Sequence, residues 1–152
     1  MDGISKALTS LPAASIIQVE GGLNAQAAQT AIATALTAHP NAKHILIGML
    51  GDENAVAAAN AAQEANRADQ VLTAGQGGDD VGLKELRGPV DSFVGTTDYL
   101  PNIYGNDVIP LACNLLAGQQ EPAQVFVKHV FLTRDNINQI HPLTGPAPSP
   151  SN

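Results

Sequence analysis

The chain has 152 residues, of which 44% are apolar and 14% are charged. This length is typical of a single domain, and the apolar content excludes intrinsic disorder for most of the chain. Seven scattered Lys and Arg residues stand against 14 Asp and Glu residues, so we expect no positively charged stripe and no nucleic-acid partner.

Several further classes of protein are disfavoured by what the sequence lacks. The single cysteine excludes a disulfide within the chain. No apolar run approaches the ~18 residues of a membrane-spanning helix. The first residues lack the basic and apolar segments of a signal peptide. The four histidines have no metal-ligand spacing, so we expect no metal site.

Five short apolar runs predict β-strands. Most are nearly continuous in apolar residues and are followed by Gly or other turn residues, a pattern typical of strands buried on both faces of a parallel sheet. The predicted strands cover residues 15–20, 44–50, 70–74, 90–97 and 125–133.

Helical segments alternate with these strands. Asn24 is expected to cap a helix that ends near Ala38, and Asp52 is expected to cap a second, Ala-rich helix over residues 53–66. A weaker helical turn is predicted over residues 80–86.

The last predicted helix covers residues 101–116, where Pro110 removes one backbone hydrogen bond. Cys113 is expected to lie on its buried face as a small apolar residue. The inner stripe of this helix is predicted to consist of Val108, Ile109, Ala112, Leu115 and Leu116.

Alternation of strands and helices predicts the α/β class, with a doubly wound, mostly parallel sheet. The Pro-rich tail over residues 143–152 is expected to be disordered.

Open sheets of this class bind ligands beyond the carboxyl ends of their strands. Three polar, Gly-containing loops follow the predicted strands there, at residues 51–54, 75–80 and 98–102. Their amides, carboxylates and one aromatic ring suit a polyhydroxylated ligand. The alternative is that Asp52 and Asp80 only cap helices and that Gly77 only turns the chain.

No other chemistry is expected at these loops. The glycines of residues 75–78 lack the spacing of a phosphate-binding loop, so we expect no nucleotide cofactor. Asp79 and Asp80 are adjacent and expected to be solvated, and there is no GxSxG motif. We therefore predict no catalytic residue and no enzyme activity.

Two longer stretches resemble a known family. Residues 35–87 contain HPNAKHILIGMLGDENAVAAA followed by VLTAGQGGDD, and residues 93–142 contain FVGTTDYLPNIYGNDVIPLACNLLAG followed by VFVKHVFLTRDNINQIHP. This ordered series resembles the carboxyl-terminal lobe of type 1 periplasmic binding proteins, the ribose- and galactose-binding family of ABC sugar importers.

The resemblance implies a solute-binding component of an ABC importer, which binds a sugar or sugar-like molecule between two lobes. It implies ABC transporter membrane subunits as partners and a place in the periplasm or cell envelope for the parent protein. Its pocket-side positions fall on Asp52, Gln76, Asp98 and Tyr99. Two positions that carry polar side chains in the family are Gly51 and Gly77 here, which puts the identity of the ligand in doubt.

Family members are about twice this long and have two lobes. The resemblance therefore implies a partial domain over residues 1–142, with the core of the second lobe in 1–98 and a crossover helix and strand in 99–142. Two alternatives share features of the fold: the effector-binding half of a LacI-type transcription regulator, and a flavodoxin-like or response-regulator-like domain.

Loss of one lobe has consequences for binding and assembly. The isolated chain is expected to bind sugars weakly or not at all, with Tyr99 either stacking on the ligand or packing at a hinge. The apolar strand over residues 125–132 and the helix before it would lack their partners, so a homo-oligomer is expected. The segment after Tyr99 is the part expected to be exchanged between copies.

Overall fold

The computed structural model describes residue 6 and residues 15–22 and 24–143. The predicted disordered tail therefore lies, except for Leu143, outside the described residues. In chain order the elements are α2 (Ala25–Ala38), β1 (Ile45–Gly48), α3 (Asp52–Glu64), the 3-10 turn η1 (Ala68–Gln70), β2 (Val71–Gly77), α4 (Asp80–Leu86), β3 (Phe93–Asp98), the 3-10 turn η2 (Pro101–Ile103), α5 (Tyr104–Leu116), β4 (Val130–Leu132) and α6 (Ile137–Ile140).

The four strands form one sheet in the order β1-β2-β3-β4. The first three strands are parallel, and β4 returns antiparallel to β3 with Val130 opposite Asp98. The predicted α/β class with a mostly parallel sheet is thus confirmed. Thr73 lies opposite Phe93 and Ala74 lies opposite Gly95, so Val94 is an extra residue that marks a bulge in β3. Strand β2 runs three residues further than predicted and pairs Gly77 with Asp98.

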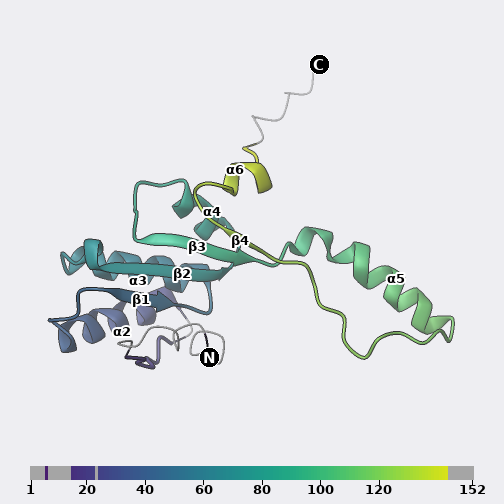
Figure 1. The fold of residues 1–152 in the computed structure, drawn as a ribbon, viewed down its shortest axis with the longest axis horizontal. Coiled ribbons are helices and arrows are strands. Elements are labelled where there is room, and N and C mark those ends of the chain that lie inside the picture. Colours follow the sequence, from purple (N-terminus) through teal and green to yellow (C-terminus); the bar gives the residue numbers. More distant parts are fainter. Residues whose placement is uncertain (1–5, 7–14, 23, 144–152) are drawn as a thin grey trace, which may run out of the picture.

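One face of the sheet carries the hydrophobic core (Figure 1). Helices α2 and α3 pack on β1 and β2 through Ile32, Leu36 and a row of alanines. Helices α3, α4 and α6 pack on β3 and β4 around Phe93 and Leu132. Alanine side chains let α3 lie close to the strands, which draws the start of this helix toward the carboxyl ends of β2 and β3. The buried alanines of α3 are Ala55, Ala57, Ala58, Ala59, Ala61 and Ala62.

The opposite face of the sheet is open over much of its area. Leu46 and Leu72 are paired neighbours on β1 and β2, yet they are 58% and 44% exposed. Phe131 of β4 lies on the same face and covers Gly95, where an added Cβ would come within 2.4 Å of the phenyl ring.

Residues 99–129, which we call the arm, leave the sheet after β3 and return to it at β4 (Figure 1). The arm contains α5, which buries none of its side chains. The prediction of a buried stripe on this helix is therefore wrong: Ile109 is 63% exposed, Leu116 is 89% exposed, and Cys113 is exposed as well. The periodic apolar pattern is real, but the described part of the chain offers this helix no surface to cover.

Two predicted strands differ from the observed ones. Residues 15–20 form no strand, and β1 pairs only with β2 among the described residues. The strand predicted over 125–133 is reduced to Val130–Leu132, the segment that lies opposite Thr96–Asp98. Apolar, β-branched residues favour a strand only where a neighbouring strand provides hydrogen bonds.

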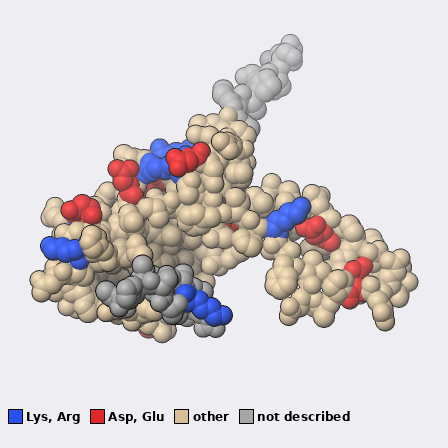
Figure 2. All heavy atoms as spheres, viewed as in Figure 1, with Lys and Arg blue, Asp and Glu red and all other residues tan. Residues whose placement is uncertain are grey.

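Charged side chains are sparse on the surface. On the face drawn in Figure 2 the Lys and Arg residues are isolated and do not form a patch. Within the part of the chain that the structure describes, no helix is long and apolar enough to cross a membrane.

Candidate functional site

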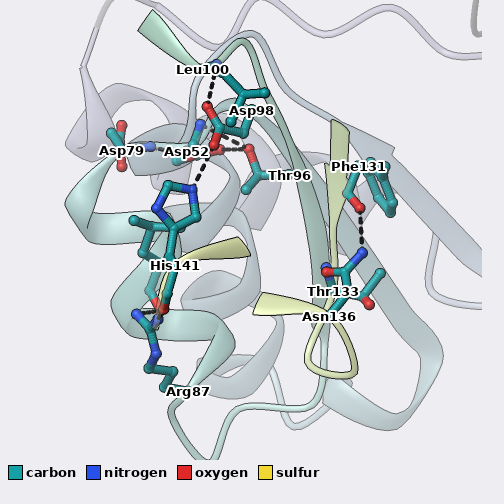
Figure 3. Close-up of polar contacts among 12 residues, drawn as sticks. Asp52, Asp79, Arg87, Thr96, Asp98, Leu100, Phe131, Thr133, Asn136 and His141 are labelled. Carbon is teal, nitrogen blue, oxygen red and sulfur yellow. Dashed lines mark hydrogen bonds and ion pairs between the residues drawn. The ribbon is translucent and has the colours of Figure 1, made fainter. Parts of the chain in front are cut away.

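The loops after β1, β2 and β3 meet at the carboxyl edge of the sheet, as expected from a parallel arrangement (Figure 3). A hollow of about 240 Å³ lies there at the start of α3. Its lining is polar apart from one leucine and consists of Leu50, Gly51, Asp52, Glu53, Asn54 and Asp79.

Asp52 lies at the centre of this edge, with its side chain directed into the protein. It is fully buried. Its Oδ1 accepts a hydrogen bond of 2.5 Å from the Thr96 hydroxyl, and its Oδ2 accepts one of 3.0 Å from the backbone N–H of Asp79. The expectation that Asp52 caps its helix is therefore wrong, because Gly51 is the N-cap residue and makes no side-chain bond there. Asp52 instead ties the loops after β1 and β2 to β3.

Glycines make room for this buried carboxylate. A Cβ at Gly75 would lie 2.2 Å from Asp52 Oδ1, and a Cβ at Gly82 would lie 2.4 Å from Oδ2. These glycines permit close approach of the backbone, so a larger residue at either position would displace Asp52.

Burial raises the pKa of Asp52 above the ordinary aspartate value. The hydrogen bonds from Thr96 and from the Asp79 N–H lower this pKa and partly offset the effect of burial, while the nearby Asp79 carboxylate raises it. The two bonds thus stabilise a charge that burial disfavours.

Asp98, the last residue of β3, is 1% exposed. Its Oδ1 accepts a hydrogen bond of 2.7 Å from the Leu100 N–H, and its Oδ2 lies 2.7 Å from Nε2 of His141. Leu100 has a left-handed conformation with φ 54°, so the chain turns sharply as it leaves the sheet. Gly78 approaches Asp98 closely with φ +70°, a conformation that suits glycine.

Gln76 and Tyr99 differ from the two aspartates because their side chains are only half-buried. Gln76 alternates with the buried Gly75, so it lies on the open face near the carboxyl end of β2. Tyr99 follows Asp98 at the start of the arm. Neither side chain makes a hydrogen bond with another described residue, and neither residue lines the hollow.

Three residues that organise this edge were not among those predicted from the sequence. Asp79, rather than Asp80, caps α4 by accepting a hydrogen bond of 3.0 Å from the Gly82 N–H. Thr96 accepts a bond of 3.3 Å from the Gly78 N–H while it donates to Asp52. His141 is distant from Asp98 in the sequence, and it lies next to Asp98 because it directly follows α6. The position of Asp79 three residues before Gly82 is a local signal that could have predicted the helix cap. The roles of Thr96 and His141 could not be predicted in this way, because they depend on contacts between residues distant in sequence.

Other kinds of site find little support in the geometry. Residues 15–22 and 24–143 contain no group of three or more His, Cys, Asp or Glu side chains that could hold a metal ion. A second, open hollow of about 590 Å³ lies between α2 and α3, away from the strand ends. There Gln29 bonds Glu64 at 2.8 Å, and the threonines of α2 bond their own helix backbone.

Comparison with known proteins identifies the fold. Residues 1–120 match the family model described as a periplasmic binding protein domain. A comparison with curated proteins gave no significant match.

Similar solved structures include an ABC transporter periplasmic solute-binding protein from Actinobacillus succinogenes with bound D-allose, at 24% identity and a TM-score of 0.76. A solute-binding protein from Agrobacterium vitis with bound allitol has 21% identity and a TM-score of 0.79, and an ABC sugar transporter subunit from Rhodobacter sphaeroides has 24% and 0.75. These matches cover 90%, 91% and 89% of this chain but 48%, 49% and 49% of the other chains.

The chain thus spans about half the length of these structures. The matched family and these neighbours are binding proteins and not enzymes. They do not favour the alternative of a LacI-type regulator.

Proposed function

The chain belongs to the periplasmic binding protein domain family, and we propose that it supplies one of two halves that enclose a sugar or sugar-like polyol for an ABC importer. The observation that carries this proposal is the small polar hollow at the carboxyl edge of the sheet. Its volume of about 240 Å³ is below the ~300–1,000 Å³ of sites that bury a small molecule. A second half is needed to complete such a site.

The charges around the hollow favour a neutral solute. Asp52, Glu53 and Asp79 line the hollow, and Asp98 lies at the same edge of the sheet, at the end of β3. They would repel an anionic solute such as a sugar phosphate. D-allose and allitol, the ligands in two similar structures, are neutral and polyhydroxylated.

We assign two kinds of role to the four candidate residues. Gln76 and Tyr99 lie beside the hollow and not in its lining, and their side chains have no hydrogen bond within the described chain. In this proposal they contact the part of the solute that extends beyond the hollow. The amide bonds hydroxyl groups, and the ring stacks on a C–H face. Asp52 and Asp98 are already bonded to protein groups, and they act by holding the three loops in place.

The whole protein would act in the periplasm or cell envelope, where the membrane subunits of the importer are its partners. In this proposal residues 1–98 form the core of one lobe. Residues 99–142 contain the arm, β4 and α6, with the arm directed toward the second half.

Saturation-transfer NMR tests the proposal because it detects weak, millimolar binding. D-allose, allitol and D-ribose serve as probes, and D-allose 6-phosphate is the anionic comparison. We expect saturable signals for the neutral probes only. Tyr99→Ala should weaken binding about fivefold, equivalent to about 1 kcal/mol.

Tyr104→Ala is the matched control, since Tyr104 is the other tyrosine and lies in α5. It should bind like the unchanged chain. Absence of a saturable signal for every neutral probe would contradict the sugar-binding role. Sub-micromolar affinity of the chain alone would contradict the need for a second half.

A further inference from the structure

The attachment of the arm to the sheet is built around one carboxylate. The chain leaves the sheet after Asp98 and re-enters it at Val130, its antiparallel partner in the register. Both ends of the arm therefore lie side by side. Since α5 buries none of its side chains, the described protein holds the arm mainly at this attachment.

The two oxygens of Asp98 serve different parts of the chain (Figure 3). Oδ1 accepts the Leu100 N–H at 2.7 Å and supports the left-handed turn with φ 54° at the start of the arm. Oδ2 lies 2.7 Å from His141 Nε2, beyond the arm and after α6.

Separate contacts anchor the segment that carries His141. Ile137 of α6 is buried in the core. Arg87, the C-cap residue of α4, donates from Nη2 to the His141 carbonyl at 2.5 Å and from Nε to Asn138 Oδ1 at 3.3 Å. Burial of Ile137 keeps this segment on the body of the lobe, and the Arg87 bonds add to the stability of the segment without contacting the imidazole. The imidazole is directed toward Asp98.

We propose that His141 is a positioning residue that acts as a clasp: through Asp98 it fixes the direction in which the arm leaves the lobe. Without the imidazole, Oδ2 of a carboxylate that is 1% exposed has no hydrogen-bond donor among the described residues. Asp52 and Asp79, at the same edge, carry further negative charge and offer Asp98 no side-chain donor (Figure 3). The Asp98 carboxylate then reorients toward water, and the Leu100 turn loses its support.

Single-molecule fluorescence transfer measures the direction of the arm at nanomolar concentration, where copies do not associate. Cys113 is the sole cysteine and lies exposed on α5. A second dye is attached through Asn60→Cys, an exposed position of α3. Removal of the clasp by His141→Leu should broaden the distribution of transfer efficiencies by about twofold or more.

Two further variants distinguish loss of the hydrogen bond between His141 and Asp98 from a general loss of stability in the segment that carries His141. His141→Gln returns an N–H donor and should restore the narrow distribution. Arg87→Met removes the hydrogen bonds to His141 O and Asn138 but leaves the imidazole, so it should lower the melting temperature without broadening the distribution. The control His44→Leu changes an exposed histidine that has no side-chain hydrogen bond in the described chain, and it should have no effect.

The clasp is contradicted if His141→Leu keeps the narrow distribution. It is equally contradicted if Arg87→Met broadens the distribution as much as His141→Leu does, since detachment of α6 would then explain both. Failure of His141→Gln to restore the distribution would show that the hydrogen bond is not the cause.

Discussion

Removal of the Thr96 hydroxyl tests how the buried Asp52 charge is stabilised. Thr96→Val keeps the shape of the side chain but deletes the 2.5 Å bond to Asp52 Oδ1 and the acceptor of the Gly78 N–H. A hydrogen bond to a charged group contributes about 1.5–3 kcal/mol. We therefore expect the free energy of unfolding to fall by about 2 kcal/mol near neutral pH.

The loss should depend on pH. Asp52 has a raised pKa in the folded protein, so the folded state holds more protons than the unfolded state in the window between the ordinary aspartate pKa, about 3.9, and the folded one. Stability due to this group falls as pH rises through that window and is constant above it. Thr96→Val raises the folded pKa further, so its penalty is largest near pH 7 and shrinks toward about pH 4.

Urea unfolding followed by circular dichroism measures both effects. With a slope of about 2 kcal/mol per molar urea, the midpoint should move down by about 1 M near neutral pH. Thr97→Val is the control, because Thr97 is half-buried on the same strand and makes no side-chain hydrogen bond with a described residue. Two results would refute this account: a midpoint shift for Thr96→Val no larger than that of the control, or an equal shift near pH 7 and near pH 4.

Three other changes have defined outcomes. Gly75→Ala should lower the free energy of unfolding by about 2–3 kcal/mol, since its Cβ would lie 2.2 Å from Asp52 Oδ1. Gly51→Ala meets nothing within 4 Å and should lower it by no more than about 1 kcal/mol, because alanine is a poorer N-cap residue than glycine. Equal urea midpoints for the two variants would show that Asp52 can move away from a Cβ at position 75. Thr73→Val removes a buried hydroxyl that has no partner among the described residues and should raise stability by about 1 kcal/mol in the same assay; a loss would reveal an unseen partner. The isolated chain should show a mass above that of the monomer in light scattering at micromolar concentration, because α5 leaves apolar side chains exposed. Leu116→Ser should shift the mass toward that of the monomer. A monomer at every concentration tested would rule out association through α5.

The sequence predicted the elements whose cause is local. Asn24 caps α2 as expected, through a 2.9 Å bond from the Ala27 N–H. The apolar runs that became β1, β2 and β3, and the polar loops after them, also follow from chain-local patterns. These loops meet because the carboxyl ends of parallel strands share an edge, so the place of the site was predictable.

Features that depend on a partner were not predictable from local patterns, and only the family resemblance indicated that α5 would lack its partner. The apolar stripe of α5 and the strand signal of residues 15–20 are both present in the sequence, but the described chain supplies no surface for either. The direction of the Asp52 side chain depends on Gly75 and Gly82, which are distant in sequence and only in the fold leave space for it. A carboxylate before an Ala-rich run looks like a helix cap, and only the packed structure distinguishes the two roles.

The pairing of Asp98 with Val130 has a consequence for how the lobe acquires its arm. Topologically, residues 99–129 are an insertion into a β-hairpin, because their two ends are already neighbours in the sheet. Loop-closure entropy grows only with the logarithm of length, so 31 residues in place of a four-residue turn cost about 2 kcal/mol. The sheet can therefore close around arms of many lengths and sequences, and the arm is free to vary with whatever surface it meets.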